Sequence, residues 1–424
     1  MNECGDWVSD PIVAEGVADG NRISGKTMER ALDILSMWFY EILDVIWKGI
    51  NECYEITETN VIVDGSHIPL NGVKSKLASV GYGGSGVQNQ MQFMAAQLRD
   101  PPIPFMVETY AGNESDASQY ADFLPMVMRC LKKGSMIVMD NGGAVKEVLD
   151  DITDNGMGYL TRVRMNLSDD RWIEESMEEF QCIDDDTCCI SHIFEHSERT
   201  VYIFFSAEKY ARAVMNAGKR AGRLAAIVAE NSFENPKKVR KSDFITVRKN
   251  PFVDVDVRIS VQRTLDPFDP DDIDVAVEEL MGDRCGYFKL ESSEPMEPIV
   301  AISVYRSRVG IEHMISSIKS VVKLKPIRVW KTPSVNGALL LALIVQLIVS
   351  LTIVDMKGEE TVKEIRGKKI KAVTKPSPKT VVRSLGQLTI TFLTENGTLK
   401  DRIYSNFDGI NSEIMEILNR IEGF

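Results

Sequence analysis

The sequence has few of the features that would identify its class at a glance. Its seven cysteines are an odd number at scattered positions, which is no disulfide framework and indicates a reducing compartment, so a cytoplasmic protein is expected. The first ten residues are acidic and lack the basic and apolar parts of a secretory signal. The glycine-rich stretch 81–86 lacks the Lys-Ser/Thr ending of a phosphate-binding loop, and it predicts a turn or a flexible loop.

An overall excess of positive charge is also missing. The formal net charge of the 424 residues is −13, which at first argues against a nucleic-acid partner. The charge is unevenly spread, however. Residues 306–383 contain 16 Lys and Arg against 5 Asp and Glu, whereas residues 1–60 contain 4 against 12. This asymmetry predicts one basic working face on an acidic body.

A single run of the sequence is apolar enough to raise the question of a membrane. Residues 337–354 would span about 27 Å as a helix, at about 1.5 Å per residue, which is just enough to cross a bilayer. The run includes Gln346, Ser350 and Thr352, and the sequence holds no second run of this kind. We therefore favour a buried core helix and expect no membrane partner.

The order of the predicted elements favours an α/β fold. Three early strands are followed by alternating helices and strands, which predicts a mixed sheet with helices on its faces. An RNase H-like core has this order, as one of several α/β options. Asp116 is expected to cap the helix that follows it. The strands are expected at 59–64, 90–98, 103–110, 136–140 and 158–164, and helices at 27–58, 116–132, 142–152, 300–324 and 337–354.

Two of the predicted strands end in an aspartate. Asp64 follows Val61-Ile62-Val63, and Asp140 follows Ile137-Val138-Met139. In open α/β sheets the reactive crevice lies beyond the carboxyl ends of the strands, so neighbouring strands would point both carboxylates into it. Carboxylate oxygens are the ligands that Mg²⁺ prefers. The alternative is that each aspartate is an ordinary turn residue at the end of a strand.

A third carboxylate lies on the predicted helix 300–324. Tyr305, Arg308, Glu312 and Lys319 fall within a stripe about 60° wide if the helix is continuous, at about 100° per residue. Such a stripe presents one carboxylate flanked by two cations and a phenol, which are the groups needed to hold a metal and grip phosphate oxygens. The alternative is an amphipathic helix in which Arg308 and Glu312 form an i,i+4 ion pair.

The spacing Tyr-x2-Arg-x3-Glu-x6-Lys resembles the signature of the insertion-sequence-four superfamily of DDE transposases, and within it the group named after element 1634. The order of the other blocks is also similar to that superfamily, from about residue 60 to 400. These blocks are Val63-Asp64-Gly65-Ser66, the stretch from Gly112-Asn113 to Ser115-Asp116, Val138-Met139-Asp140-Asn141-Gly142-Gly143, and Lys325-Pro326-Ile327 followed by the apolar run 337–354.

The resemblance implies a concrete function. Asp64, Asp140 and Glu312 would be catalytic and would bind two divalent ions, Mg²⁺ or Mn²⁺ as a substitute, which activate the attacking oxygen and stabilise the leaving one. Tyr305, Arg308 and Lys319 would hold the DNA backbone. The protein would cut double-stranded DNA at transposon ends and join it to target DNA, as a homodimer on the DNA.

The resemblance also implies how the chain is divided. An RNase H-like core would be interrupted by a β-rich insertion, in agreement with the change in character after residue 166. The expected parts are a helical segment 1–58, the first core part 59–165, the inserted subdomain 166–290, the second core part 291–356 with the glutamate-bearing helix, and a basic linker with a C-terminal helix at 357–424.

Several alternatives remain open at the level of the sequence. Members of the superfamily usually carry an end-recognition domain before the first aspartate, whereas here the segment before it is short and acidic. A truncated, inactive relic that only binds DNA is therefore the second interpretation. The cluster Cys182, Cys188, Cys189, His192 and His196 suggests zinc but has no Cys-x2-Cys pattern. His67 near Asp64 is more readily a loop histidine, and Trp330 a packed aromatic rather than a stacking platform for a flipped base.

Overall fold

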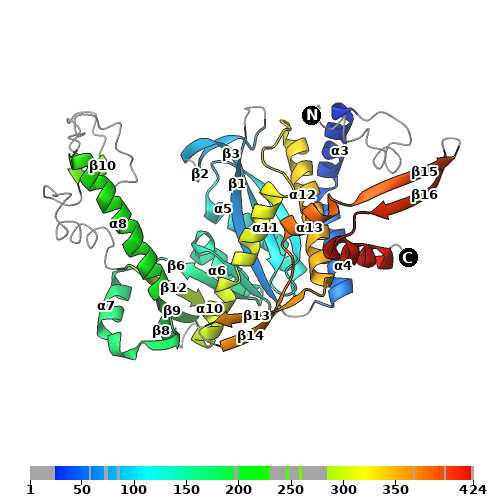
Figure 1. The fold of residues 1–424 in the computed structure, drawn as a ribbon. Coiled ribbons are helices and arrows are strands. Elements are labelled where there is room, and N and C mark those ends of the chain that lie inside the picture. Colours follow the sequence, from blue (N-terminus) through cyan, green and yellow to red (C-terminus); the bar gives the residue numbers. More distant parts are fainter. Residues whose placement is uncertain are drawn as a thin grey trace. The chain divides into compact units, whose positions relative to one another are not determined.

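The computed structural model describes residues 24–56, 59–70, 75–83, 86–194, 199–229, 245–247, 257–259, 284–365, 368–395 and 398–421. The chain divides into two compact units (Figure 1). Unit 1 combines Met1–Thr161 with Ile302–Phe424, and unit 2 is the intervening Arg162–Ala301. The chain crosses between the units within a strand, β6 (Gly158–Val163), and within a helix, α10 (Pro298–Arg306).

Unit 1 is built on a mixed sheet with strand order β2-β3-β1-β5-β6. The strand β4 also pairs with β3 but is not part of this linear order. The pairs β1–β5 and β5–β6 are parallel, whereas β3 is antiparallel to β1, β2 and β4. This arrangement confirms the predicted RNase H-like α/β fold. The other strands are β1 (Asn60–Pro69), β2 (Ser79–Gly83), β3 (Gly86–Leu98), β4 (Pro104–Ala111) and β5 (Met136–Met139).

The glycine-rich stretch 81–86, predicted as a turn or a flexible loop, contributes residues to two paired strands. Residues 81–83 belong to β2, and Gly86 begins β3, with Gly83 opposite Gly86 in the antiparallel pair. The glycine content reflects a close backbone approach. A Cβ atom on Gly81 would lie 1.9 Å from the carbonyl oxygen of Gly112, so no larger residue fits there without a shift.

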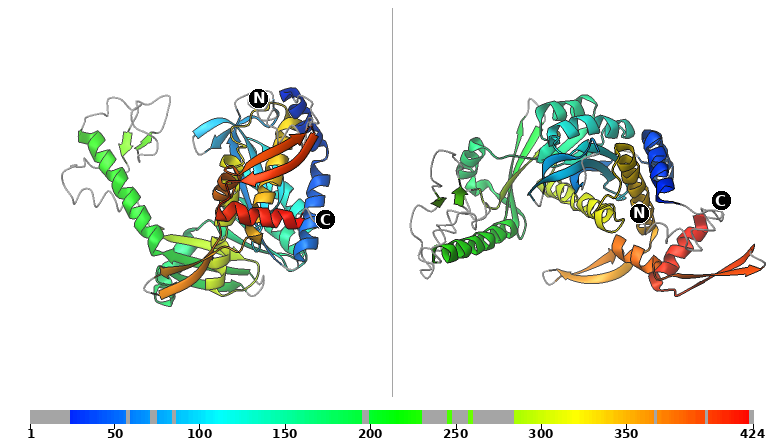
Figure 2. Two further views of the ribbon diagram at one scale, coloured as in Figure 1. Left: turned by 45° about the vertical axis from the view of Figure 1, so that its right-hand side comes forward. Right: turned by 90° about the horizontal axis from the view of Figure 1, so that it is seen from above.

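Helices cover both faces of this sheet (Figure 2). In the right-hand view, α5 (Asp116–Cys130) and α6 (Lys146–Asp154) lie on one side and α11 (Val309–Ser320) on the other. Burial on two faces explains why β5 and most of β4 are apolar along their length instead of alternating. The cap of α5 is Ser115 and not Asp116, because the Ser115 hydroxyl accepts a hydrogen bond from the Ser118 amide at 3.2 Å.

The predicted first helix is two helices, α3 (Gly25–Met37) and α4 (Phe39–Tyr54), with a break at Trp38. Both pack against α12 (Thr332–Asp355), which holds the apolar run. Among the described residues, α12 is the one helix long and apolar enough to cross a membrane, but 56% of its apolar window is buried. Its Gln346 amide donates to the Ser350 hydroxyl at 3.1 Å, in a buried setting. These contacts are those of a core helix.

The basic linker that we predicted after residue 357 is structured. Two hairpins and two helices follow one another, and a small core of Met356, Val381, Ile414 and Ile417 joins α12 to the helices. The prolines at 376 and 378 suggested an irregular segment, but Pro378 begins a helix, where its missing N–H costs nothing. These elements are β13 (Glu359–Ile365), β14 (Lys368–Thr374), α13 (Pro378–Leu385), β15 (Thr389–Glu395), β16 (Thr398–Ser405) and α14 (Gly409–Ile421).

Unit 2 is organised around an antiparallel ladder of four strands in the order β12-β9-β8-β7. Its stacked aromatic core includes Tyr202, Phe204 and Phe288. The elements of this unit are α7 (Leu167–Glu175), β7 (Gln181–Asp184), β8 (Thr187–Phe194), β9 (Arg199–Ser206), α8 (Ala207–Ala229), the pair β10 (Ile245–Val247) and β11 (Val257–Ile259), and β12 (Tyr287–Ser292).

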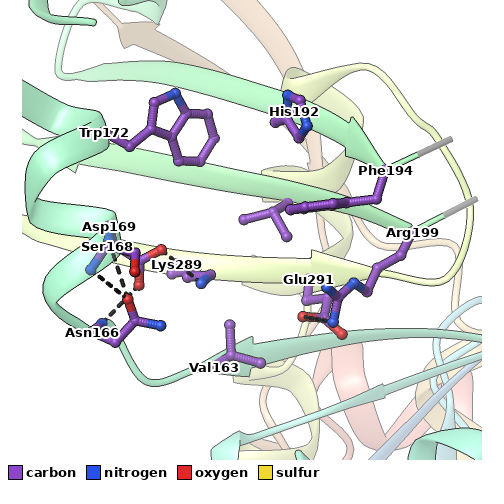
Figure 3. A pocket seen from close by; sticks show the side chains of 11 residues that line it. Val163, Asn166, Ser168, Asp169, Trp172, His192, Phe194, Arg199, Lys289 and Glu291 are labelled. Carbon is purple, nitrogen blue, oxygen red and sulfur yellow. Dashed lines mark hydrogen bonds and ion pairs between the residues drawn. The ribbon is translucent and has the colours of Figure 1, made fainter. Parts of the chain in front are cut away.

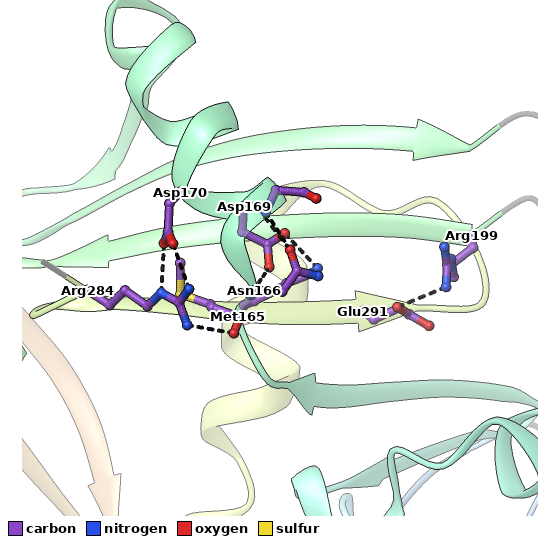
Figure 4. A network of polar contacts seen from close by, with 9 residues as sticks. Met165, Asn166, Asp169, Asp170, Arg199, Arg284 and Glu291 are labelled. Atoms are coloured by element: carbon purple, nitrogen blue, oxygen red, sulfur yellow. Dashed lines mark hydrogen bonds and ion pairs between the residues drawn. The ribbon is translucent and has the colours of Figure 1, made fainter.

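Ion pairs attach α7 to this ladder (Figure 4). Arg284 grips both carboxylate oxygens of Asp170 at 2.7 and 2.6 Å, and it also donates to the carbonyl of Met165. Deeper in the unit, Lys289 of β12 reaches Asp169 at 2.7 Å, and both side chains are largely buried. Asp169 also accepts from the backbone of Asn166 and so completes a capping box at the start of α7.

We expect Gly337→Ala to destabilise unit 1. A Cβ atom at this position of α12 would lie 2.0 Å from the carbonyl oxygen of Leu32 in α3, so the two helices must separate. Overpacking of this kind costs about 1–3 kcal/mol of unfolding free energy, which urea denaturation measures. The matched control is Gly49→Ala in α4, where nothing lies within 4 Å and alanine is the better helix former. Equal effects of the two substitutions would contradict the close helix contact.

In unit 2, we expect Lys289→Ala to lower the free energy of unfolding by about 3 kcal/mol, because it leaves the buried Asp169 without its cation. The control is Arg284→Ala, which removes an ion pair with much greater exposure and should have a smaller effect. Thermal unfolding of both variants tests this ranking, and the reverse order would show that the Lys289 pair is not needed to offset the buried carboxylate.

Candidate functional site

The two aspartates predicted from the sequence lie side by side. The parallel ladder between β1 and β5 ends at the pair Ile62 and Val138, and Asp64 and Asp140 each lie two residues further along. We predicted that Asp64 ends its strand. It lies within the strand instead, because β1 stays paired with β3 as far as Pro69. What ends at this point is the pairing with β5. The two aspartates therefore lie just beyond the end of the hydrogen-bonded ladder between these two inner strands.

Local backbone contacts orient each carboxylate. The Gly65 amide donates to Asp64 Oδ1 at 2.9 Å, and the Asn141 amide donates to Asp140 Oδ1 at 2.7 Å. In both residues one oxygen is thus held by the next amide along the chain. The second oxygen, Oδ2, is directed at a shared partner.

That partner is the guanidinium of Arg308. Its Nη2 atom lies 3.1 Å from Asp64 Oδ2 and 3.5 Å from Asp140 Oδ2, and its Nη1 atom donates to the Tyr305 hydroxyl at 3.1 Å. The Tyr305 hydroxyl in turn donates to Asp140 Oδ1 at 3.5 Å. The side chains of Arg308 and Asp64 are 10% and 18% exposed, so their ion pair is poorly screened by solvent, whereas the Asp140 side chain is 45% exposed. One cation therefore lies between two carboxylates.

The charges of this group act on one another. Burial raises the pKa of Asp64, and the neighbouring carboxylates of Asp140 and Glu312 raise it further, whereas Arg308 and the Gly65 amide lower it. Burial would lower the pKa of Arg308, but Asp64 and its other neighbours raise it above the ordinary value. The guanidinium thus remains charged, and it favours the ionised form of a carboxylate that burial would otherwise protonate.

We predicted that one continuous helix carries these residues, and this prediction was wrong. The helix is broken at Ser307–Arg308, between α10 and α11. The Arg308 amide donates to the Tyr305 carbonyl and the Gly310 amide to the Ser307 carbonyl, both three residues back, which tightens the turn. Tyr305 therefore belongs to α10, and Arg308 is the residue before α11. The break directs Arg308 inward and leaves Glu312 exposed in the first turn of α11.

Glu312 is the least integrated of the predicted metal ligands. Its charge acts on Asp64, but no cluster of three or more His, Cys, Asp or Glu side chains arranged for a metal occurs in the described part of the chain. Asp64 and Asp140 fit a divalent ion, because the Oδ2 atoms of both carboxylates are directed at the same position, which the Nη2 atom of Arg308 occupies. The structure thus assembles two of the three expected carboxylates.

Lys319 lies in the last turn of α11. Its ammonium donates to the Ser66 hydroxyl and lies over the Phe93 ring, 5.8 Å from the centroid. Burial lowers the pKa of Lys319 to about 8, and the positive charge of Lys325 acts in the same direction, against Asp64. His67 lies nearby on β1, and burial, Lys319 and Lys325 all lower its pKa. A neutral histidine beside a partly deprotonated lysine limits the positive charge on this side of the site.

Two buried side chains that the sequence analysis did not single out hold the backbone of Asp140. The hydroxyl of Thr161 on β6 donates to the Asp140 carbonyl at 3.2 Å. The phenol of Tyr120 on α5 lies on the other side and contacts the backbone at Asp140 and at Val63. The adjacent pair Gly142-Gly143 was the available signal, since its lack of side chains indicates that another group packs closely there.

The other candidates lie apart from this site. In unit 2, Cys182 faces Cys188 across β7 and β8, but these residues are in no metal cluster within the described ranges, and His196 lies outside them. His192 contacts the rings of Trp172 and Phe194 and not a thiol. Trp330 is 40% exposed.

The aromatic residues of unit 2 line a cavity of about 550 Å³ (Figure 3). Trp172, His192 and Phe194 form one wall, with edge-to-face contacts at 6.2 and 4.7 Å between ring centroids. The ion pairs Arg199–Glu291 and Lys289–Asp169 line the cavity as well, and both are closed within the protein. The cavity is therefore lined by aromatic side chains on one side and also by charged side chains that pair with each other.

Comparison with known proteins identifies the family. The model of the transposase DDE domain matches residues 56–348. No curated protein matches the chain. Among solved structures, the chain is similar to a piggyBac transposase synaptic complex with hairpin DNA, at 8% identity and a TM-score of 0.33, with 71% of this chain and 50% of that chain covered. It is also similar to a Mos1 mariner paired end complex with Mn, at 13% identity and a TM-score of 0.18, with 37% and 56% covered.

The chain spans about half the length of these solved transposase chains, and at such scores neither likeness contributes to the assignment. The family match is of a different weight. It covers well over half of the chain and includes all three carboxylates considered above, at 64, 140 and 312. The chain belongs to the family of transposases with a DDE domain.

Proposed function

We propose that this protein cleaves double-stranded DNA at transposon ends and joins the freed end to target DNA, in a cut-and-paste reaction that requires divalent metal ions. The observation that carries the proposal is the contact of Asp64 and Asp140 with the same guanidinium, that of Arg308. The two aspartates lie just beyond the point where the pairing of two inner strands of an RNase H-like sheet ends. The spacing of Tyr305, Arg308, Glu312 and Lys319 supports membership of the insertion-sequence-four superfamily, in the group of element 1634.

In the proposed reaction, Asp64, Asp140 and Glu312 would hold two Mg²⁺ ions. Bound Mg²⁺ supplies Lewis-acid activation of the attacking oxygen and stabilisation of the leaving one. Water attacks the phosphodiester phosphorus at the transposon end, the bond to the 3′ oxygen breaks, and a 3′-hydroxyl is released. That hydroxyl later attacks a phosphodiester of the target in the same way. Because Asp64 and Asp140 lie on adjacent strands of a buried sheet, they are held in place before DNA arrives.

The cations of the signature take two roles in this proposal. Lys319 is half-buried beside Ser66 and would bind a phosphate of the DNA backbone. Arg308 pairs with both aspartates in the protein alone, and together with Tyr305 it would hold the DNA backbone. The remaining basic residues of 306–383 bind the flanking duplex, and a homodimer brings two ends together in the cytoplasm.

A second candidate function is a DNA-binding relic without cleavage activity. The observation that favours it is the arrangement of charges, because Arg308 already bridges both aspartates and Glu312 stays outside the pair. In that case the protein binds transposon DNA in the absence of metal, and Mg²⁺ changes nothing.

Substitution of the carboxylates separates these functions. We expect Asp64→Asn, Asp140→Asn and Glu312→Gln each to reduce Mg²⁺-dependent cleavage by about 10³-fold or more, because residues that act as a unit fail together. The assay is cleavage of a labelled duplex that carries the inverted repeats flanking the reading frame, with Mg²⁺, Mn²⁺ or EDTA. Glu147→Gln, at an exposed acidic position of α6, is the matched control and should cleave normally.

Two results of this assay would decide against the proposal. If wild-type protein binds the repeats but never cuts them, the relic is the correct interpretation. If Glu312→Gln alone cleaves like wild-type protein, the two aspartates act without the third carboxylate.

The lowered pKa of Lys319 predicts a pH dependence of DNA binding. Its ammonium is charged below about pH 8 and neutral above, so phosphate binding at higher pH requires uptake of a proton. DNA affinity should then fall by up to about tenfold per pH unit above pH 8. Lys319→Arg stays protonated and should flatten this profile, whereas Lys146→Arg at an exposed site should not. Fluorescence anisotropy between pH 7 and 9.5 at constant ionic strength measures it, and equal slopes for all three proteins would contradict this role.

A further inference from the structure

Tyr120 of α5 is fully buried directly behind the two aspartates. Its hydroxyl donates to the carbonyl of Val63 at 3.5 Å, and the backbone of Asp140 lies close enough to its oxygen to favour the ionised phenol, which acts to lower its pKa. One phenol therefore connects the residue before the first aspartate to the second aspartate itself. This connection lies beyond Ile62 and Val138, where the ladder between β1 and β5 ends. The phenol continues the joining of the two strands after their own hydrogen bonds stop.

The ring of Tyr120 also packs against the turn that follows Asp140. A Cβ atom on Gly142 would lie 3.0 Å from Asp116 Cβ and 3.2 Å from ring atom Cε2, and one on Gly143 would lie 2.5 Å from Met139 Sδ and 3.0 Å from ring atom Cδ1. The turn therefore lies against the ring. Since Thr161 holds the Asp140 carbonyl from β6, the backbone of this aspartate is fixed from both sides. The side chain then has little freedom except at its carboxylate.

We propose that Tyr120 is a positioning residue that sets the separation of Asp64 and Asp140 for divalent-metal binding. This inference rests on the proposed function of the aspartate pair. Phenylalanine would fill the same space, so the packing of the ring alone does not account for a hydroxyl here. A polar group in a fully buried position needs partners, and the partners of this hydroxyl are the two backbone positions whose spacing matters.

The test compares Tyr120→Phe with Tyr110→Phe. Each substitution removes one phenolic oxygen, but Tyr110 donates to Asp122 at 3.0 Å, away from the aspartate pair. We expect Tyr120→Phe to bind Mn²⁺ about tenfold more weakly in calorimetric titrations of the full chain, as is usual when a supporting contact behind metal ligands is lost. Tyr110→Phe should bind like wild-type protein.

A second readout does not depend on metal. Hydrogen exchange of the segment 136–143, followed by mass spectrometry, should be faster in metal-free Tyr120→Phe, because the strand end loses the contact of the phenol with Val63 and the nearby oxygen that interacts with the Asp140 backbone. Exchange in Tyr110→Phe should be unchanged there. If Tyr120→Phe does not fold, Gly142→Ala crowds the same ring, whose Cε2 atom would lie 3.2 Å from the added Cβ with Asp116 Cβ at 3.0 Å, and leaves the hydroxyl in place. It should weaken Mn²⁺ binding in the same direction.

The outcomes separate this inference from the proposed function. If Asp64→Asn leaves Mn²⁺ binding unchanged, the aspartate pair is not the metal site, and the proposed function fails. If Asp64→Asn abolishes binding while Tyr120→Phe binds Mn²⁺ and exchanges like wild-type protein, the role of Tyr120 is wrong and the metal site stands. Weaker binding and faster exchange in Tyr120→Phe alone support the inference.

Discussion

The contact of one guanidinium with two carboxylates is the interaction on which the site in unit 1 depends. Arg308 comes from the part of unit 1 that follows unit 2, and it pairs with Asp64 and Asp140 from the part that precedes unit 2. Arg308 and Asp64 are both largely buried, and each favours the charged form of the other. The break between α10 and α11 places the guanidinium there, and α11 is held by its packing on β1 and β3.

A carboxylate must be ionised before it can bind a metal, and burial acts against this. Burial raises the pKa of Asp64, which on its own would favour a protonated and poorly coordinating side chain. The neighbouring guanidinium counteracts that effect. The signature arginine therefore has a role in the free protein as well as the role toward DNA that the resemblance implies. This dual use explains why a residue expected to face DNA is one of the most buried charged residues of the chain.

The sequence predicted the fold because its signals are local and strong. The run Val61 to Val63 and the run Met136 to Met139 are continuous apolar strands buried on both faces, and their order with the helices leaves few topologies. The pairing of β1 with both β3 and β5 depends on contacts between distant residues, so the sequence alone placed the end of the strand at Asp64. The hairpins after residue 357 were also missed, because the basic residues and nearby prolines indicated a linker.

The site was predictable in its composition but not in its connections. Tyr305, Arg308, Glu312 and Lys319 were found from their spacing, on the assumption of one continuous helix. The structure breaks that helix, so Arg308 and Glu312 point to different surroundings. Nothing in the spacing indicates Tyr120 or Thr161, because their importance comes from backbone atoms of Asp140 that any residue would present.

The interruption of unit 1 by unit 2 has a consequence for how the protein is made. Asp64 and Asp140 leave the ribosome early, but Arg308 and α12 follow only after the whole of Arg162–Ala301 has been synthesised. Until then the aspartate pair has no counter-ion, and β4, α3 and α4 lack the helix that covers them. Unit 2 is contiguous and can fold as the chain emerges, whereas unit 1 cannot. A nascent chain therefore lacks the complete arrangement until both unit 2 and α11 have been synthesised.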